Sequence, residues 1–299
     1  MLSAIALKLY TTAAAVAPAA RIATALRIAR TRAVWLLMRL VPHERMSRWA
    51  ARGLLRPLTR LTGRGELAIL GGTAVRLRIE ARSFVPWGAQ AYAVLTGTHE
   101  IQVQQALIRS LRPGDHVWDV GANIGYLALV AARIVGPAGR VVAVEPDPGC
   151  AAAIRANAAL NDLRTIEVVE AAASAHSGVA ALVVVRDRLW TRLASVGDHH
   201  EGEARVDVRT VALDDLDGPP PALVKIDVEG AELEVIAGMT RLLRDERPIV
   251  VCEMHGRNAA FCAAIQDAGY TVTNLDGPEP VPEADVNVHA LCTPLERAG

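Results

Sequence analysis

A short stretch of the chain has the residue types and the spacing of a nucleotide-binding loop. It reads Asp119-Val-Gly121-Ala-Asn123-Ile-Gly125 and follows an apolar run. Gly121 permits a tight turn, Gly125 lets the backbone approach a ligand, and Asn123 can orient the loop. Asp119 is placed to contact a cationic amino group. Structural alternatives stay open, because Asp119 could cap the next helix and Asn123 could supply left-handed backbone.

A second carboxylate, Glu145, stands at the expected end of the next strand. A carboxylate there can accept hydrogen bonds from both hydroxyls of a ribose. A dinucleotide cofactor would need G-x-G-x-x-G facing its pyrophosphate, and the loop lacks that run. The sequence therefore predicts a cofactor with a free ribose, and we include Tyr126, directly after the loop, among the residues that bind it. The structural alternative for Glu145 is a solvated strand end.

The hydrophobic pattern predicts a parallel sheet that positions these residues. From about residue 99 onward, short apolar runs alternate with helical stretches. We expect strands near 117–120, 140–145, 166–170, 223–226, 249–253, 271–275 and 287–292, and helices near 123–135, 148–160, from 231 and over 258–268. This alternation is typical of a parallel sheet, and ligands bind beyond the carboxyl ends of such strands. Residues 179–211 interrupt the pattern, and we interpret them as a hairpin.

The N-terminal part of the chain has a different character. Residues 1–64 hold Lys8 and eleven Arg against one acid, Glu44. Apolar residues between 19 and 41 follow the spacing of one helical face. Two interpretations stay open: a helical appendage that packs on the rest of the chain or on a second copy, and a helix that lies on a membrane surface.

Residues 65–98 are expected to form a β-hairpin with one dry face and a connector to the acceptor side, since apolar and polar residues alternate around Gly71-Gly72. The chain thus divides into 1–64, a basic helical appendage, 65–98, and 99–299, the α/β domain. Metal-binding cysteine spacing is absent, which favours reduced thiols in the cytoplasm. With no run of 18 uncharged apolar residues, we expect no spanning helix, and any membrane contact would be peripheral, at the inner face.

Three stretches of the chain resemble the FkbM family of methyltransferases. They are VWDVGANIGY at 117–126, LVKIDVEGAELEVIAGM at 223–239 and IVVCEMH at 249–255, and the middle one is the most specific. With Glu145-Pro146 and VALDDL at 211–216, the likeness covers roughly residues 92–292 and leaves out the basic N-terminal region.

The resemblance implies a Rossmann-like class I methyltransferase fold with about seven strands. It implies S-adenosylmethionine as methyl donor and, as acceptor, a hydroxyl on a sugar, glycoside or polyketide. In such folds the adenine usually lies near the end of the third strand, which places it here beside Glu170 and Ala171. The residues expected around the acceptor are Trp87, Tyr92, His99, Glu100 and the segment from Trp190 to His200.

Methyl transfer to an alcohol calls for a general base or a metal ion near the transferring methyl group. Four residues at later strand ends are the catalytic candidates: His255, Asp227, Glu229 and Glu253. His255 is our first choice as base, since histidine titrates near neutrality. If a divalent metal such as Mg²⁺ is used, Asp227, Glu229 and Glu253 are its expected ligands. The alternatives are a hydrogen-bonded histidine and acids that anchor a turn, while Lys225 is expected to pair with a buried acid.

Other functions fit the sequence less well. A nucleic-acid partner is not expected, because the basic residues lie among few stacking aromatics and the chain has Asp227-Val-Glu-Gly where an N/D-P-P-Y/F stretch would stand. The chain also lacks the glycine pattern that a nicotinamide oxidoreductase would need. The non-enzymatic alternative is a methyltransferase-like scaffold that associates with a membrane or partner through residues 1–64.

Overall fold

The computed structural model describes residues 65–80, 93–184, 191–193, 204–284 and 287–296, and five single helical positions between 25 and 36. The basic region 1–64 lies otherwise outside these residues. So do Trp87, Tyr92, Trp190, His199 and His200, which we expect around the acceptor. The division of the chain at residues 64 and 98, and the role of the N-terminal region, stay predictions.

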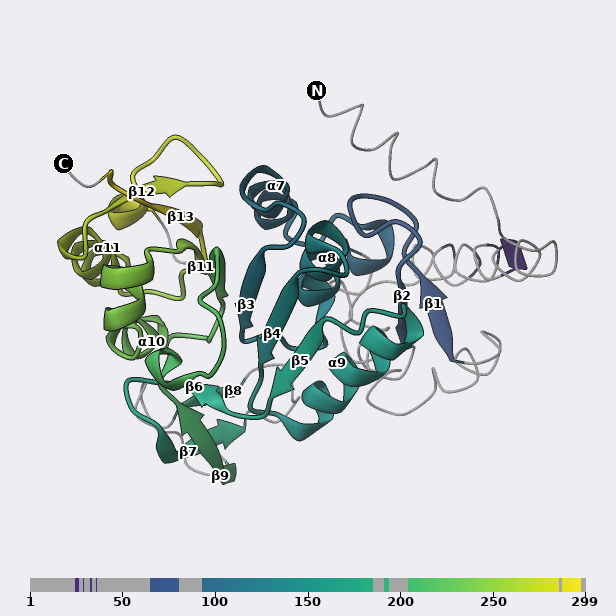
Figure 1. Cartoon of the computed structure of the whole chain (residues 1–299), viewed down its shortest axis with the longest axis horizontal. Helices are drawn as coiled ribbons and strands as arrows, with labels where there is room; N and C mark the ends of the chain where they lie inside the picture. Colours follow the sequence, from purple (N-terminus) through teal and green to yellow (C-terminus); the bar gives the residue numbers. More distant parts are fainter. Residues whose placement is uncertain are drawn as a thin grey trace.

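A seven-stranded sheet forms the centre of the molecule (Figure 1). Its order is β12-β13-β11-β10-β3-β4-β5, in which β13 runs antiparallel to both neighbours and the other pairs are parallel. The bounds are β3 His116–Val120, β4 Arg140–Val144, β5 Ile166–Val169, β10 Leu223–Ile226, β11 Ile249–Glu253, β12 Tyr270–Asn274 and β13 His289–Pro294. The predicted Rossmann-like, mostly parallel sheet of about seven strands is confirmed.

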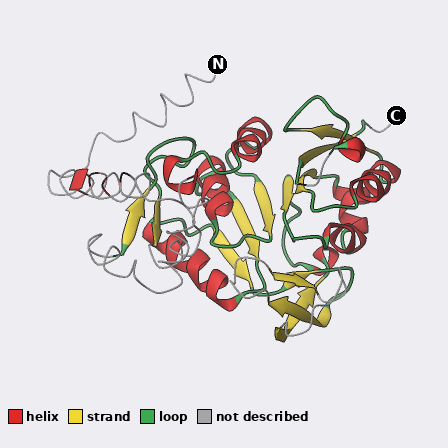
Figure 2. Ribbon diagram, turned by 180° about the vertical axis from the view of Figure 1, so that it is seen from behind, coloured by secondary structure: helices red, strands yellow, loops and turns green. Residues whose placement is uncertain are grey.

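Helices cover both faces of this sheet (Figure 2). On one face lie α7 Ile101–Ser110, α8 Tyr126–Val135 and α9 Pro148–Leu160, and on the other lie α10 Glu232–Ala237 and α11 Asn258–Asp267. Helix α9 begins where the sequence predicts, because Asp147 accepts a hydrogen bond from the Cys150 amide and Pro148 takes the first helical position. Helix α8 starts later than expected, at Tyr126, since Asn123 and Gly125 are left-handed.

Successive side chains along each strand point alternately toward the two layers of helices. Val117, Leu223 and Val251 face α7 and α8, whereas their neighbours Trp118, Val224 and Val250 face α10 and α11. Residues two apart on a strand share a face. Asp119, Lys225 and Glu253 therefore belong to the α7 side of the sheet, as does His289, which is two residues before Leu291 on β13.

The expected hairpin near residue 70 is a short antiparallel pair, β1 Glu66–Ala68 with β2 Arg78–Glu80. It is fastened to α9 through two asparagines. Asn157 Oδ1 accepts a hydrogen bond from the Glu80 amide at 2.7 Å, and Asn161 Oδ1 accepts one from the Arg78 amide at 2.7 Å. This side-chain bonding satisfies backbone groups that a strand edge would leave unpaired.

A smaller sheet projects beyond the end of the main one (Figure 1). It has the order β6-β9-β7-β8, with β6 Ala172–Ala173, β7 Gly178–Val184, β8 Thr191–Leu193 and β9 Ala204–Val211. The antiparallel β7-β9 pair confirms the hairpin predicted over residues 179–211. The described residues also include the short helical turns Leu213–Asp215, Leu242–Glu246 and Val281–Glu283. No helix among the described residues is both long and apolar enough to cross a membrane.

Candidate functional site

The loop after β3 is shaped by three left-handed residues, Gly121, Asn123 and Gly125, with φ values of 72°, 52° and 82°. A Cβ on Gly121 would lie 1.7 Å from the carbonyl oxygen of Asp227, so this glycine lets two strand exits touch. A Cβ on Gly125 would meet the Ile154 side chain at 3.1 Å. Gly125 therefore lets the loop pack closely against α9, and its expected approach to a ligand stays a prediction. Asn123 supplies the left-handed backbone that we left open as an alternative.

Glu145 closes the other side of this loop. Its Oε2 accepts a hydrogen bond from the Asn123 amide at 2.8 Å, and its Oε1 accepts one from the Asp147 amide at 2.9 Å. Burial nevertheless raises the pKa of Glu145 to about 7, against the lowering effect of these two bonds. Each carboxylate oxygen has a second lone pair, so both can still accept from a ligand hydroxyl. Glu145 is thus buried and anchored, not a solvated strand end.

A pocket opens beyond the carboxyl ends of β3, β4 and β10. Polar groups from predicted cofactor and catalytic residues line it together with apolar side chains. The lining residues are Gly121, Asn123, Val144, Glu145, Pro146, Asp147, Cys150, Ala172, Ala173, Leu182, Asp227, Val228, Glu229 and Ala231. An apolar slot with a few polar anchors suits a nucleoside.

Five of the predicted cofactor residues do not line this pocket. Tyr126 turns to α7, where its hydroxyl accepts a hydrogen bond from Gln104 Nε2 at 3.1 Å and its ring meets His99 edge-on. Glu170 instead forms an ion pair with Arg155 at 2.5 Å, and both side chains are about half exposed. The other residues outside the lining are Asp119, Gly125 and Ala171, while Ala172 and Ala173 do line it. The position of the adenine stays a prediction.

Lys225 joins the ends of β3 and β10. Its Nζ lies 3.4 Å from Oδ1 of Asp119 and 3.3 Å from Oδ2 of Asp227, and it donates a hydrogen bond to the Gly121 carbonyl at 3.2 Å. Burial alone would lower the pKa of Lys225, but the two aspartates raise it, so the ammonium form persists. The predicted pairing of Lys225 with a buried acid is confirmed. Burial also raises the pKa of Asp119.

His255 lies at the centre of four carboxylates. Its Nδ1 is 2.9 Å from Oε1 of Glu232, and its Nε2 is 3.5 Å from Oε2 of Glu229. The same Nε2 is 3.8 Å from oxygens of both Asp227 and Glu253. The structure thus brings together all four predicted catalytic residues, and it adds Glu232 to them.

The charges in this group change the role that His255 can take. Burial alone would lower the pKa of His255, but the Glu232 hydrogen bond and the charges of Glu229 and Asp227 raise it to about 9. Burial raises the pKa of Glu229 to about 7, against the effect of His255. Near neutrality His255 therefore holds a proton, and Glu229, which lines the pocket, is the group that can accept one.

Glu253 connects His255 to a second group of polar residues. Its Oε2 lies 3.8 Å from Nε2 of His289, the residue opposite it on β13. Burial and the charge of Asp227 raise the pKa of Glu253. Glu100, at the start of α7, belongs to the same group.

Two sets of three residues among those described hold ligand atoms within 4.8 Å of one another: Asp227, Glu229 and His255, and Glu100, Glu253 and His289. The predicted metal set joined Glu253 to Asp227 and Glu229. Glu253 falls in the second set, opposite His289 on β13, although its carboxylate also lies near His255. The predicted metal set therefore stays a prediction. His289 carries no signal in the sequence, since its partners lie 36 and more positions away.

Comparison with known proteins agrees with this geometry. A family model described as the methyltransferase FkbM domain matches residues 119–273. The 31-O-demethyl-FK506 methyltransferase FkbM of Streptomyces tacrolimicus is 32% identical over 206 residues, which are 56% of this chain and 77% of that protein.

Two further relatives are similar over comparable stretches. The hexuronic acid methyltransferase AglP of Haloferax volcanii is 30% identical over 161 residues, 52% of this chain and 62% of that protein. The methyltransferase sdnD of Sordaria araneosa is 27% identical over 202 residues, 56% of this chain and 77% of that protein.

Proposed function

Because the chain belongs to the FkbM methyltransferase family, we propose that it transfers a methyl group from S-adenosylmethionine to a hydroxyl of a sugar, glycoside or polyketide-type acceptor. The observation that supports the proposal is that two residues belong both to the cofactor pocket and to the His255 group. Asp227 and Glu229 line the pocket and also lie within 3.8 Å of His255, so groups that can exchange protons stand directly beside the expected cofactor.

S-adenosylmethionine supplies an activated methyl group on a sulfonium, which an oxygen nucleophile can accept. The residues that would hold it are Gly121 and Asn123 in the loop and Glu145 at the ribose. These residues fit the cofactor for two reasons. Glu145 is a buried hydrogen-bond acceptor, suited to ribose hydroxyls, beside an apolar slot. Gly121 has no side chain, so the loop can turn tightly there.

The acceptor hydroxyl becomes a good nucleophile as it loses its proton. Glu229 suits this step because its pKa of about 7 leaves it largely able to accept a proton near neutrality. His255, held protonated by Glu232, would keep a positive charge beside Glu229 and Asp227 and orient both carboxylates. Our first choice of base from the sequence, His255, thus gives way to Glu229, with His255 as its positioning partner.

The acceptor class is supported by the relatives' names. One acts on a hexuronic acid and another on 31-O-demethyl-FK506. Both names point to oxygen-rich acceptors, and the cluster of carboxylates and histidines on the acceptor side offers many hydrogen-bond acceptors for hydroxyl groups. The alternative of a non-catalytic scaffold is weakened by the intact pocket.

The proposal is tested by measuring the release of S-adenosylhomocysteine with hexuronic acid glycosides and macrolide alcohols as acceptors. We expect release only when an acceptor with a free hydroxyl is present, and mass spectrometry should find one added methyl group on oxygen. His255→Ala should lower turnover about 100-fold while leaving cofactor affinity nearly unchanged. Folded protein that does not bind S-adenosylmethionine would instead support the scaffold.

A further inference from the structure

We propose that Glu100, Glu253 and His289 form a binding site for one divalent transition-metal cation on the acceptor side of the sheet. One ligand atom from each residue lies within 4.8 Å of the others. The site adjoins the His255 group through Glu253, whose Oε1 lies 3.8 Å from His255 and whose Oε2 lies 3.8 Å from His289. It does not depend on the methyl-transfer proposal, because it can be tested by metal binding alone.

Three elements bring these residues together. Glu253 ends β11, and His289 begins β13 directly opposite it in the antiparallel register. Both side chains face the α7 layer, and α7 packs against β11 and β13. Glu100 stands at the first position before α7, so its carboxylate enters the group from above the sheet. The three ligands therefore come from rigid elements, which is what a preorganised metal site requires.

Two of the three ligands are held by one atom and present the other. Oε1 of Glu100 lies 2.8 Å from Nε2 of His99, whereas Oε2 of Glu100 is buried and has no hydrogen-bond partner among the described residues. Nδ1 of His289 lies 2.9 Å from Oδ2 of Asp276, and the same oxygen accepts a hydrogen bond from the His289 amide at 2.6 Å. Nε2 of His289 is likewise buried and without a hydrogen-bond partner in the described part of the chain.

The contact between Asp276 and Nδ1 fixes the ring of His289, so that Nε2 turns toward Glu253 and lies 3.8 Å from its Oε2. Together with Oε2 of Glu100, this gives a buried nitrogen and a buried oxygen that no described residue satisfies by a hydrogen bond. Polar atoms of this kind are costly to bury, and a cation coordinated by them removes that cost. A carboxylate that orients a histidine through its other nitrogen is the usual support of a metal ligand.

The buried ammonium of Lys225 attracts the carboxylates of Glu100 and Glu253 through space, but its printed ion pairs in the described part of the chain are with two other acids. Nζ of Lys225 is shared between Asp119 and Asp227 at 3.4 and 3.3 Å. The His255 group is a weaker candidate, because His255 already contacts Glu232 and Glu229 through its two nitrogens at 2.9 and 3.5 Å. One imidazole nitrogen with two carboxylates suits Mn²⁺, Fe²⁺ or Zn²⁺ better than Mg²⁺ or Ca²⁺.

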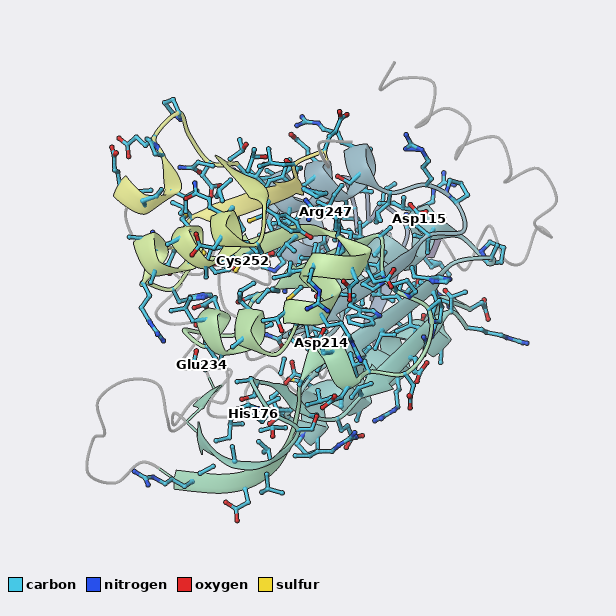
Figure 3. All side chains as sticks on the ribbon, turned by 60° about the vertical axis from the view of Figure 1, so that its left-hand side comes forward. Asp115, His176, Asp214, Glu234, Arg247 and Cys252 are labelled. Atoms are coloured by element: carbon cyan, nitrogen blue, oxygen red, sulfur yellow. The ribbon has the colours of Figure 1, made fainter. Side chains whose placement is uncertain are left out.

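The test is titration of the full chain with Mn²⁺, followed by electron paramagnetic resonance, without cofactor or acceptor, and with Zn²⁺ as competitor. We expect one Mn²⁺ per chain, displaced by Zn²⁺. Glu100→Gln and His289→Gln should each weaken binding more than tenfold, whereas His255→Gln and His176→Gln should bind as the unaltered chain does. His176 lies beside the small sheet, away from the group, and is labelled in Figure 3.

A positioning variant adds a second readout. Asp276→Asn keeps all three ligands but removes the charge that orients His289, and it should weaken Mn²⁺ binding about 10- to 100-fold. Thermal unfolding of each variant shows that it is folded, and bound metal should raise Tm only where the three ligands are intact. The proposal is overturned if the unaltered chain binds neither Mn²⁺ nor Zn²⁺. It is also overturned if binding is lost in His255→Gln and kept in Glu100→Gln and His289→Gln.

Discussion

Nδ1 of His255 and the amide of Gly230 share one oxygen, Oε1 of Glu232, at 2.9 and 2.8 Å. Glu232 is 2% exposed, so these bonds form in a place that water does not reach. The carboxylate therefore fixes the turn after β10 and, at the same time, the ring orientation of the histidine. It is a positioning residue, and it leaves Nε2 of His255 facing Glu229, Asp227 and Glu253.

Glu232→Gln should lower the pKa of His255 from about 9 toward the ordinary histidine value, because the variant removes a charged acceptor at 2.9 Å. Turnover should fall about 10- to 100-fold with a smaller change in KM. The pKa is measured by NMR titration of the imidazole signals. Glu234→Gln, two residues further along α10, where Glu234 pairs with Arg257, is the matched control, and Glu234 is labelled in Figure 3. An unchanged His255 pKa in Glu232→Gln would show that other carboxylates hold the proton.

The rate should depend on pH with two limbs. Glu229, with a pKa of about 7, must lose its proton to act as base, so kcat/KM should rise as pH increases through about 7. His255, with a pKa of about 9, must keep its proton, so the rate should fall above about 9. Glu229→Gln should lower turnover about 100-fold and abolish the rise near neutrality. A rise near pH 7 that persists in Glu229→Gln would assign it to another group.

Cofactor affinity should also depend on pH, through Glu145. Its pKa of about 7 means that the carboxylate is protonated below neutrality, when it accepts hydrogen bonds less well. Binding of S-adenosylmethionine should therefore tighten as pH rises from 6 to 8. Glu145→Ala should weaken binding at least tenfold, since it removes the acceptor and also the support of the Asn123 and Asp147 amides. Calorimetric titration measures both effects. Glu167→Gln, a half-exposed acid on β5, should bind normally.

Gly121→Ala should destabilise the chain far more than Gly114→Ala. Gly121 and Gly114 both have positive φ, but only at Gly121 would the added Cβ meet backbone, 1.7 Å from the Asp227 carbonyl oxygen. Gly114→Ala should cost about 1–2 kcal/mol from the left-handed backbone alone. Gly121→Ala should cost about 4 kcal/mol or more. Urea denaturation gives both free energies of unfolding, and equal losses would mean that the loop can move away from Asp227.

Lys225→Met should destabilise the chain by about 3–5 kcal/mol, because it leaves the buried Asp119 and the partly buried Asp227 without their cation. Adding Asp119→Asn should restore part of that loss, since one of the two charges is then gone. A double-mutant cycle on the free energy of unfolding measures the coupling. Strict additivity of the two substitutions would show that Lys225 and Asp119 do not interact.

Much of the main sheet could be predicted from the sequence, because its strands are apolar runs with turn-forming or polar residues at both ends. Strands β10 and β11 and helix α9 begin and end where the pattern places them. Helix α7 was not predicted, since its buried positions include Gln104, which spoils the apolar stripe. The two-residue strand β6 carries too little pattern to be recognised, and it exists through pairing with β9.

The site was predictable only where residues follow strands directly. Asp227, Glu229, Glu253 and His255 come together because the carboxyl ends of parallel strands meet at one edge. The role of Tyr126 and the grouping of Glu253 with His289 were missed, since both depend on packing against α7 and on an antiparallel strand near residue 290. The pKa of His255 depends on four carboxylates whose distances no spacing reveals.

The hairpin of β12 and β13 touches the rest of the sheet through β13 alone, along β11. It contributes His289 to the acceptor side but none of the residues around the cofactor pocket. If this edge opens locally, the proposed metal site loses one of its three ligands, whereas the cofactor pocket rests on β3, β4 and β10 and keeps its lining. Substitutions in the hairpin should therefore change metal binding without disturbing the residues proposed to hold the methyl donor.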